Sequence, residues 1–408
     1  MLIAPTCDGD DVGEAWVGYQ WVKHLRKNHE VTLLTYNKRG VKPASQQFPG
    51  LRVVEWSEPS FLSRAERLNS IVKPGYIPFY FRARSWLQRA LARGERFDVV
   101  HQPLPVAMRY PSPAAGMGIP LVMGPVGGGL PTPEGFAADE GSSPWFMKLR
   151  SLDRVRRSWD PLLRRTYQDA ACVLGIAPYV KEELRAIRLR RFEVLSETGL
   201  ETVPGPIDRS NRPGKVHLLY VGRLVRTKGA RDIIRALGRK PGMNVQLDIV
   251  GDGPERAHCE NLVKSLGLAD QVTLHGWKAK NQVMEFYQNA DIFVFPSYRE
   301  PGGNVALEAM AHSLPLIVVD RGGPGSAVSD ACAIKLPVTT PDALAEDLAA
   351  AIEKLASDAP LRRKMGAEAY DHVRQVALWE AKIAYIDTLF AELANSARGS
   401  HNQVKPGV

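Results

Sequence analysis

The chain has 408 residues, a length typical of two domains of ordinary size. Its hydrophobic content of 44% is that of a globular protein, and it has no run of about 18 uncharged apolar residues that could cross a membrane. The N-terminus has neither the basic start nor the apolar stretch of a secretory signal. The four cysteines are far apart, which argues against a zinc site and a disulfide framework. We therefore expect a cytoplasmic protein.

The net charge of +9 is spread unevenly. Residues 1–205 hold 28 Lys and Arg against 21 Asp and Glu, a balance of +7, whereas the remainder holds 25 against 23, a balance of +2. Basic charge can indicate a nucleic-acid partner, but no recognised nucleic-acid motif accompanies it, so we expect none. The excess in the first half is concentrated in residues 145–165, where seven cations and two acids are interleaved with Trp and Leu. That composition suits a helix on an anionic membrane, although a solvated helix packed on the core has the same pattern.

In chain order, short apolar runs alternate with segments of helical spacing. In the first half we predict strands at 2–5, 31–36, 51–56, 97–101, 119–124 and 171–176, with helices at 13–27, 79–93 and 145–167. In the second half we predict strands at 216–222, 245–251, 271–276, 291–296 and 314–320, with helices at 228–238, 255–266, 282–289 and 303–312. Strand–helix alternation predicts parallel sheets covered on both faces.

The pattern restarts after residues 202–215, which are rich in Pro, Gly and Asn and have no periodicity. We therefore expect a Rossmann-like domain over 1–204 and a second over 205–378, facing each other across a cleft. A final helix over 379–395 would pack on the first domain, and 396–408 would be a disordered tail. In such sheets ligands bind beyond the carboxyl ends of the strands, so each motif is judged by whether it follows a strand.

Two glutamates follow the strand at 291–296. Glu300 lies on a loop beside Gly302 and Gly303, and Glu308 lies within the apolar helix that the loop opens. Glycines at a helix start expose backbone N–H groups, which makes an anion site suited to phosphate. A buried carboxylate needs hydrogen-bond donors, and ribose hydroxyls are suitable. The alternative is that both are ordinary surface or capping glutamates.

Two cations follow the strand at 216–222. Gly222 and Arg223 turn away from the strand, and Lys228 opens the next helix. Arginine can bind a diphosphate bidentately, and lysine binds it as a point charge. The alternative is a solvated basic loop.

Other candidates are weaker. Gly251 and Gly253 follow a strand but lack the third glycine of a dinucleotide fingerprint in register, and Gly276 and Trp277 follow the next strand, where a nucleobase could rest. In the first half, glycine-containing loops with Asp11, Gly13, Gly127 and Gly128 follow two strands, so a ligand could approach the backbone closely. We expect His101 just past a strand, although a single histidine there is often structural.

These motifs together resemble the retaining glycosyltransferases of family 4, which have the GT-B fold. The resemblance is carried by YVGRLVRTKG, LDIVGDGP, VTLHGW and the E-x7-E motif REPGGNVALEAM. It implies a nucleotide-sugar donor, with a UDP, GDP or ADP moiety. The residues that it implies for the donor are Arg223 and Lys228 at the diphosphate, Glu300 at the sugar, Glu308 at the ribose, and Gly302, Gly303 and Asn304 around the sugar and phosphate, with His101 facing the reacting sugar.

We therefore predict a retaining glycosyltransferase that acts on a carbohydrate or lipid-linked acceptor, in polysaccharide or glycolipid biosynthesis. No Asp-x-Asp clamp is visible at the donor site, so we expect no metal and no other cofactor. The alternatives are a sugar-nucleotide epimerase of the same fold and a non-catalytic nucleotide-sugar-binding protein. The sequence does not distinguish among the nucleotide bases, the sugars or the acceptors.

Overall fold

The computed structural model describes residues 1–11, 13–37, 41–59, 73–139, 156, 159–209 and 214–402. Most of the predicted membrane segment 145–165 therefore lies outside the described residues. The chain divides into two compact units, each treated separately below. The first unit comprises Met1–Gly129, Trp145–Thr198 and Lys382–Val408, and the second comprises Leu130–Pro144 and Gly199–Ala381.

The first unit contains a parallel sheet in the order β3-β2-β1-β4-β5-β6-β7. Its strands are β1 (Leu2–Ile3), β2 (Thr32–Asn37), β3 (Arg52–Ser57), β4 (Val100–Gln102), β5 (Leu121–Val126), β6 (Cys172–Gly175) and β7 (Phe192–Val194). Its described helices are α1 (Glu14–Leu25), α2 (Ala44–Gln47), α4 (Tyr76–Ala92), α7 (Pro161–Asp169), α8 (Tyr179–Glu183) and most of α16 (Trp379–Asn402). The strand order reverses between β1 and β4, which are neighbours.

The second unit contains a parallel sheet in the order β10-β9-β8-β11-β12-β13. Its strands are β8 (Val216–Val221), β9 (Val245–Val250), β10 (Val272–Gly276), β11 (Ile292–Phe295), β12 (Leu316–Val319) and β13 (Ala333–Leu336). Its α-helices are α9 (Ala230–Arg239), α10 (Arg256–Ser265), α11 (Lys280–Asn289), α12 (Asn304–Ala311), α13 (Gly322–Ala327), α14 (Pro341–Ser357) and α15 (Ala359–Val376), and 3₁₀ turns occur at Glu134–Phe136 and Arg226–Lys228.

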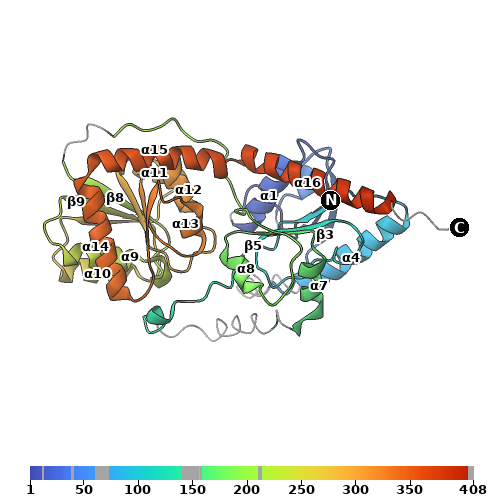
Figure 1. Cartoon of the computed structure of the whole chain (residues 1–408), viewed down its shortest axis with the longest axis horizontal. Helices are drawn as coiled ribbons and strands as arrows, with labels where there is room; N and C mark the ends of the chain where they lie inside the picture. Colours follow the sequence, from blue (N-terminus) through green and yellow to red (C-terminus); the bar gives the residue numbers. More distant parts are fainter. Residues whose placement is uncertain are drawn as a thin grey trace. The chain divides into compact units, whose positions relative to one another are not determined.

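Helices cover both faces of the second sheet. Helices α9, α10 and α14 lie on one face, and α11, α12 and α15 lie on the other (Figure 1). This arrangement follows from the winding, because the crossovers from β8 to β10 and those from β11 to β13 run in opposite directions from the centre of the sheet. Strands β11 and β12 are buried along their whole length, as expected for central strands of a doubly covered parallel sheet.

The structure differs from the sequence-based expectation in several places. The strands β7 and β13 were not predicted, because each is short and only partly buried. The last helix continues to Asn402 rather than ending at residue 395, so residues 396–402 are not a disordered tail. Finally, Leu130–Pro144 clusters with the second unit, although it lies far upstream of the expected boundary. We call its described part, residues 130–139, the strap.

Candidate active site

The candidate site lies at the carboxyl edge of the second sheet. Strands β8 and β11 are hydrogen-bonded neighbours, and the strand order reverses at this point. The loop after β8 spans residues 222–229, and the loop after β11 spans residues 296–303. Ligands of doubly wound sheets bind at such a switch point because the two loops diverge to opposite faces. The two loops carry Arg223, Lys228 and Glu300.

Lys228 and Glu300 contact each other across the switch point. The ammonium of Lys228 forms an ion pair with Oε2 of Glu300, and the two side chains are 18% and 20% exposed. The ammonium also lies 5.9 Å from the centroid of the Phe295 ring. Because both groups are mostly shielded from water, their charges interact more strongly than those of an exposed pair. The sequence predicted both residues for one site, and the structure brings them together.

Arg223 lies on the same loop as Lys228, but its side chain is exposed. Within the described residues, the structure records no ion pair or hydrogen bond for its guanidinium. Its backbone carbonyl accepts a hydrogen bond from the Tyr220 hydroxyl at 3.2 Å, which fixes the start of the loop. An exposed guanidinium beside a fixed loop is available to an anionic ligand.

Glu308 lies in α12 and is partly buried. The phenol of Tyr287, a fully buried residue of α11, donates a hydrogen bond to Glu308 Oε2 at 3.0 Å. Burial raises the pKa of Glu308, and the hydrogen bond from Tyr287 opposes that rise. The His312 ring stacks on Tyr287 and hydrogen-bonds the Glu308 carbonyl at 2.8 Å. The carboxylate therefore has a partner within the protein, which the sequence analysis did not foresee.

The start of α12 is shaped by glycine. Gly303 has φ of 84° and caps the helix without a side-chain hydrogen bond, while Asn304 at the first helical position is exposed. A Cβ at Gly303 would lie 3.0 Å from the Pro324 ring. Gly323 is confined by the same loop, because a Cβ there would lie 2.1 Å from the carbonyl oxygen of Gly302. The first N–H groups of α12 therefore follow directly on the loop that carries Glu300.

The structure assigns a packing role to Gly251 and Gly253. A Cβ at Gly251 would lie 2.0 Å from the carbonyl oxygen of Gly222, and one at Gly253 would lie 2.4 Å from that of Leu224. Both glycines thus let the loop after β8 lie directly against the loop after β9. Further along the edge, Gly276 ends β10 with φ of 71°, and Trp277 follows it with 75% of its surface exposed. An exposed indole at this edge is a platform on which a planar base could stack.

In the first unit, the two predicted glycine-containing loops follow β1 and β5, which lie on either side of β4 in the sheet. Asp11 and Gly13 precede α1, and Gly13 caps that helix with φ of 75°. Gly127 packs its backbone against Ile176, and the N–H of Gly128 donates to the Tyr179 hydroxyl at 3.1 Å. These residues are therefore at the carboxyl edge of their own sheet, as the sequence predicted.

His101 is not where the sequence placed it. It lies inside β4 and is 1% exposed, between the rings of Trp21 and Phe390. Its Nε2 is 2.7 Å from the Gly124 carbonyl oxygen, and burial lowers its pKa to about 4. It lines a cavity of ≈ 620 Å³ together with residues that begin the strands, such as Val31 and Val99, so it faces the amino edge of the sheet. The prediction that it follows the strand is wrong, because the strand runs one residue beyond it.

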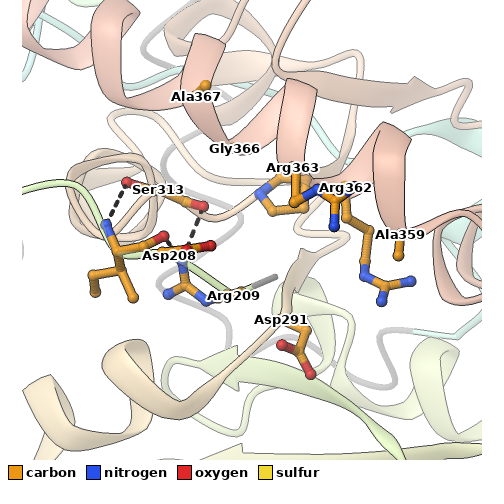
Figure 2. Close-up of a pocket in the computed structure, with 11 residues that line it drawn as sticks. Asp208, Arg209, Asp291, Ser313, Ala359, Arg362, Arg363, Gly366 and Ala367 are labelled. Carbon is orange, nitrogen blue, oxygen red and sulfur yellow. Dashed lines mark hydrogen bonds between the residues drawn. The ribbon is translucent and has the colours of Figure 1, made fainter. Parts of the chain in front are cut away.

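A smaller cavity of ≈ 140 Å³ lies at the amino edge of the second sheet, beside residues 207–209 (Figure 2). The guanidinium of Arg209 donates to the backbone carbonyls of Tyr287, Ala290 and Ser313 at 3.1, 2.6 and 3.2 Å. Figure 2 shows Arg362 and Arg363 on the other side of the same cavity. Arg209 therefore ties the entering chain to the start of the sheet, and this cavity is remote from Lys228 and Glu300 along the strands.

Sequence analysis missed Arg226. It is 8% exposed, forms ion pairs with Asp232 and Asp139, and lies beside the rings of Phe136 and Tyr298. Its position in the basic run RTK is typical of a solvated loop, and both Asp139 and Phe136 are distant in sequence. No signal within the loop itself could have indicated these contacts.

In the part of the chain that the structure describes, no three His, Cys, Asp or Glu side chains are grouped so as to hold a metal ion. Among the same residues, no helix has the length and apolar character needed to span a bilayer.

Comparison with known proteins gives the family. Residues 207–372 match the model described as "Glycosyl transferases group 1", and residues 13–196 match "Glycosyl transferase 4-like domain". D-inositol 3-phosphate glycosyltransferase of Paenarthrobacter aurescens is 30% identical over 182 residues, which are 43% of this chain and 44% of that protein. The lipopolysaccharide core biosynthesis glycosyltransferase LpsD of Rhizobium meliloti is 32% identical over 215 residues, 51% of this chain and 60% of that protein. The chain thus spans about half the length of these curated relatives.

The same fold occurs in HepE of Anabaena, solved in complex with UDP. That structure aligns with 97% of this chain and 99% of its own, with a TM-score of 0.61 and 17% identity. The two family matches together span most of the chain, and the two parallel α/β units are those of the GT-B fold. The chain belongs to the group 1 glycosyltransferases of this fold.

Proposed function

We propose that the protein transfers a sugar from a nucleotide-sugar donor to a hydroxyl group of a carbohydrate or lipid-linked acceptor, with retention of configuration and without a metal ion. The observation that carries the proposal is the meeting of Lys228 and Glu300 at the switch point of the second sheet. The UDP complex of the HepE neighbour supports a nucleotide-sugar donor, and the lipopolysaccharide relative supports a role in polysaccharide or glycolipid biosynthesis.

In this proposal the second unit binds the donor. Lys228 and Arg223 neutralise the diphosphate, and Glu308 accepts hydrogen bonds from the ribose. Glu300 and the backbone of Gly302, Gly303 and Asn304 hold the sugar. The base rests on the edge formed by Gly276 and Trp277, while Gly222, Gly251 and Gly253 shape the loops that support it. The loops of Asp11, Gly13, Gly127 and Gly128 bind the acceptor.

The chemistry follows from charge. The bond between the anomeric carbon and the diphosphate oxygen breaks, and negative charge develops on the departing diphosphate. The cations of Lys228 and Arg223, with the α12 N-terminus, stabilise that charge in place. The acceptor hydroxyl oxygen forms the new bond on the same face of the sugar, and its proton passes to the departing phosphate. We assign no proton transfer to His101, because it is buried within β4.

The test begins with binding. A panel of UDP-, GDP- and ADP-sugars is titrated by calorimetry in the presence of EDTA, against the wild type and the variants Lys228→Ala, Glu300→Gln and Arg223→Ala. We expect one donor to bind, and Lys228→Ala to weaken it by roughly tenfold or more, because a charge-assisted hydrogen bond is lost. Arg239→Gln, which breaks an exposed ion pair at the far end of α9, is the control. Wild-type affinity and turnover in all three variants would refute the site assignment.

A separate experiment tests whether transfer is independent of metal ions and retains the anomeric configuration. Transfer to an acceptor is followed with and without EDTA, and the anomeric configuration of the product is determined by NMR. Loss of transfer in EDTA that Mg²⁺ restores would overturn the metal-independent mechanism, and an inverted product would overturn retention. Neither result would affect the family assignment.

We also propose that residues 145–165 place the protein on the cytoplasmic face of an anionic membrane. The support is their composition in the sequence together with the exposed side chains of Trp159 and Leu162 in the described part. Co-sedimentation with vesicles of phosphatidylglycerol at low salt is expected, and absence of co-sedimentation would contradict the proposal.

A further inference from the structure

The strap, residues 130–139, is bound to the second unit along its length. Phe136 is fully buried, with its ring centroid 4.3 Å from that of Tyr298. Nη2 of Arg321 donates to the Pro131 carbonyl at 2.7 Å, and Nη1 of Arg299 donates to Thr132 Oγ1 at 3.3 Å. The strap therefore lies against the loop that follows β11.

Arg226 is the centre of these contacts. Its Nη1 and Nη2 donate to the two carboxylate oxygens of Asp232 at 2.6 and 3.0 Å, and its Nε donates to Asp139 Oδ2 at 2.9 Å. The guanidinium carbon lies 5.6 Å from the ring centroids of both Phe136 and Tyr298. One side chain thus joins the strap, helix α9 and the loop after β11.

The cluster contains two guanidinium groups, those of Arg226 and Arg235, and two carboxyl groups, those of Asp139 and Asp232. Asp232 is fully buried, and burial raises its pKa despite the adjacent guanidinium. Partial burial also acts to raise the pKa of Asp139, but the hydrogen bond and charge of Arg226 bring it below its ordinary value. Arg235 lies 3.6 Å from each carboxylate. Removing one buried partner leaves the others uncompensated, which is costly in a shielded site.

The sequence positions of the cluster connect it to the candidate site. Arg226 precedes Lys228 by two residues in the same 3₁₀ turn, and Tyr298 precedes Glu300 by two residues in the other loop. Nε of Arg321 also donates to the Tyr298 carbonyl at 3.1 Å. The orientation of Lys228 toward Glu300 therefore depends on backbone that Arg226 and the strap hold.

We propose that Arg226 is a positioning residue for the Lys228–Glu300 pair and that it acts through the strap. The relevance of this positioning to catalysis rests on the proposed function. The positioning itself is a property of the protein without a bound donor. An arginine is required, because no other side chain offers five donors in a planar fork to two carboxylates and two rings. A lysine would keep the charge and lose the geometry.

The first experiment needs no donor. Hydrogen–deuterium exchange is measured on the full chain for peptides covering residues 222–229 and 297–304, in the wild type, Asp139→Asn and Arg226→Lys. We expect exchange in both loops to rise roughly tenfold, because a hydrogen bond to a charged group is lost. Arg239→Gln is expected to leave both loops unchanged. If Asp139→Asn does not fold, Phe136→Leu replaces it. Faster exchange in the strap alone, or no change at all, would overturn the proposal.

The second experiment is a double-mutant cycle. Its ligand is the nucleoside diphosphate of whichever donor binds in the calorimetric titration. Asp139→Asn is expected to weaken its binding roughly tenfold in the wild-type background and less than about twofold in the Lys228→Ala background, because the effect passes through Lys228. Equal losses in both backgrounds would mean a general destabilisation and would overturn the proposal. If the wild type binds no nucleotide, the proposed function fails, while the exchange experiment still decides whether Arg226 positions the loops.

Discussion

At the scale of single residues, Glu308 shows how a carboxylate is accommodated in an apolar helix. The sequence indicated a ribose as its partner, whereas the structure shows that the buried phenol of Tyr287 already donates to one of its oxygens. The two partners are compatible, because an ionised carboxylate accepts several hydrogen bonds. Tyr287 keeps the group oriented before a ligand binds, which lowers the entropic cost of binding.

The raised pKa of Glu308 leads to a prediction about stability. Its folded-state pKa lies above the ordinary value of 4.5, so its favourable contribution is complete below that pH and is lost as the pH rises through the folded-state pKa. Glu308→Gln, a neutral isostere, should therefore raise the melting temperature at pH 7 and have little effect at pH 4. The same substitution should also weaken binding of the nucleotide-sugar donor by roughly tenfold or more. Thermal denaturation between pH 4 and 8 checks the first part, and a lower melting temperature at pH 7 would contradict it.

The two predicted site residues that the structure brings into contact share one property. Lys228 and Glu300 follow adjacent strands, so the strand pattern alone places them at the same edge. His101 failed this test because the boundary of a three-residue strand decides whether it lies in the core or beyond it. Arg226 could not be found, since its partners Asp139 and Phe136 come from another part of the chain. Local patterns identify loops at strand ends but not the distant segments that pack on them.

At the scale of elements, apolar runs located every central strand. The two unpredicted strands, β7 and β13, are edge strands with partly exposed side chains, so their hydrophobic signal is weak. Two glycines in the loop after β9 have a packing role that the motif pattern did not indicate. Gly251 and Gly253 resemble part of a dinucleotide fingerprint, but their close contacts are with the neighbouring loop of the protein.

A matched pair of substitutions tests that role. Gly251 and Gly242 both have positive φ, of 138° and 91°, but a Cβ at Gly242 would meet nothing within 4 Å, whereas one at Gly251 would lie 2.0 Å from the Gly222 carbonyl oxygen. Gly242→Ala should cost about 1–2 kcal/mol of unfolding free energy from its backbone conformation alone. Gly251→Ala should cost at least about 2 kcal/mol more, because backbone must move. Urea denaturation measures both, and equal costs would show that the loop contact is unimportant.

At the scale of the whole molecule, the chain does not divide at a single linker. The sequence predicted a boundary near residue 204 and a final helix, from residue 379, on the first domain. The strap was not predicted, because it lies far upstream of that boundary and belongs to the second unit. The strap has no apolar periodicity, so nothing in its own sequence predicts a strand or helix. Individual contacts, such as those of Phe136 and Asp139 with Arg226, bind it to the second unit. The long helix α16 passes from the second unit to the first at Lys382.

The contribution of Lys382 to the stability of the folded protein depends on pH. It is 2% exposed, and its ammonium donates to Ser196 Oγ and to the carbonyls of Ser196 and Thr198. Burial lowers its pKa from 10.5 to about 7, against the opposing charge of Glu197. Between these values the unfolded chain binds more protons than the folded chain, so the contribution of Lys382 to stability grows as the pH rises and is lost as the pH falls through 7.

The comparison with Lys382→Met isolates this contribution. The variant loses the hydrogen bonds at every pH, which costs about 1–3 kcal/mol and does not vary with pH, because the three oxygens are left without their donor. The difference in unfolding free energy between wild type and variant should therefore increase from pH 7 to pH 9.5, in favour of the wild type. Lys364→Met, at an exposed position of α15, should show no such trend. Urea denaturation at a series of pH values measures the difference, and a constant difference would mean that Lys382 keeps its proton throughout and that its charge, rather than its neutral form, holds α16 to the first unit.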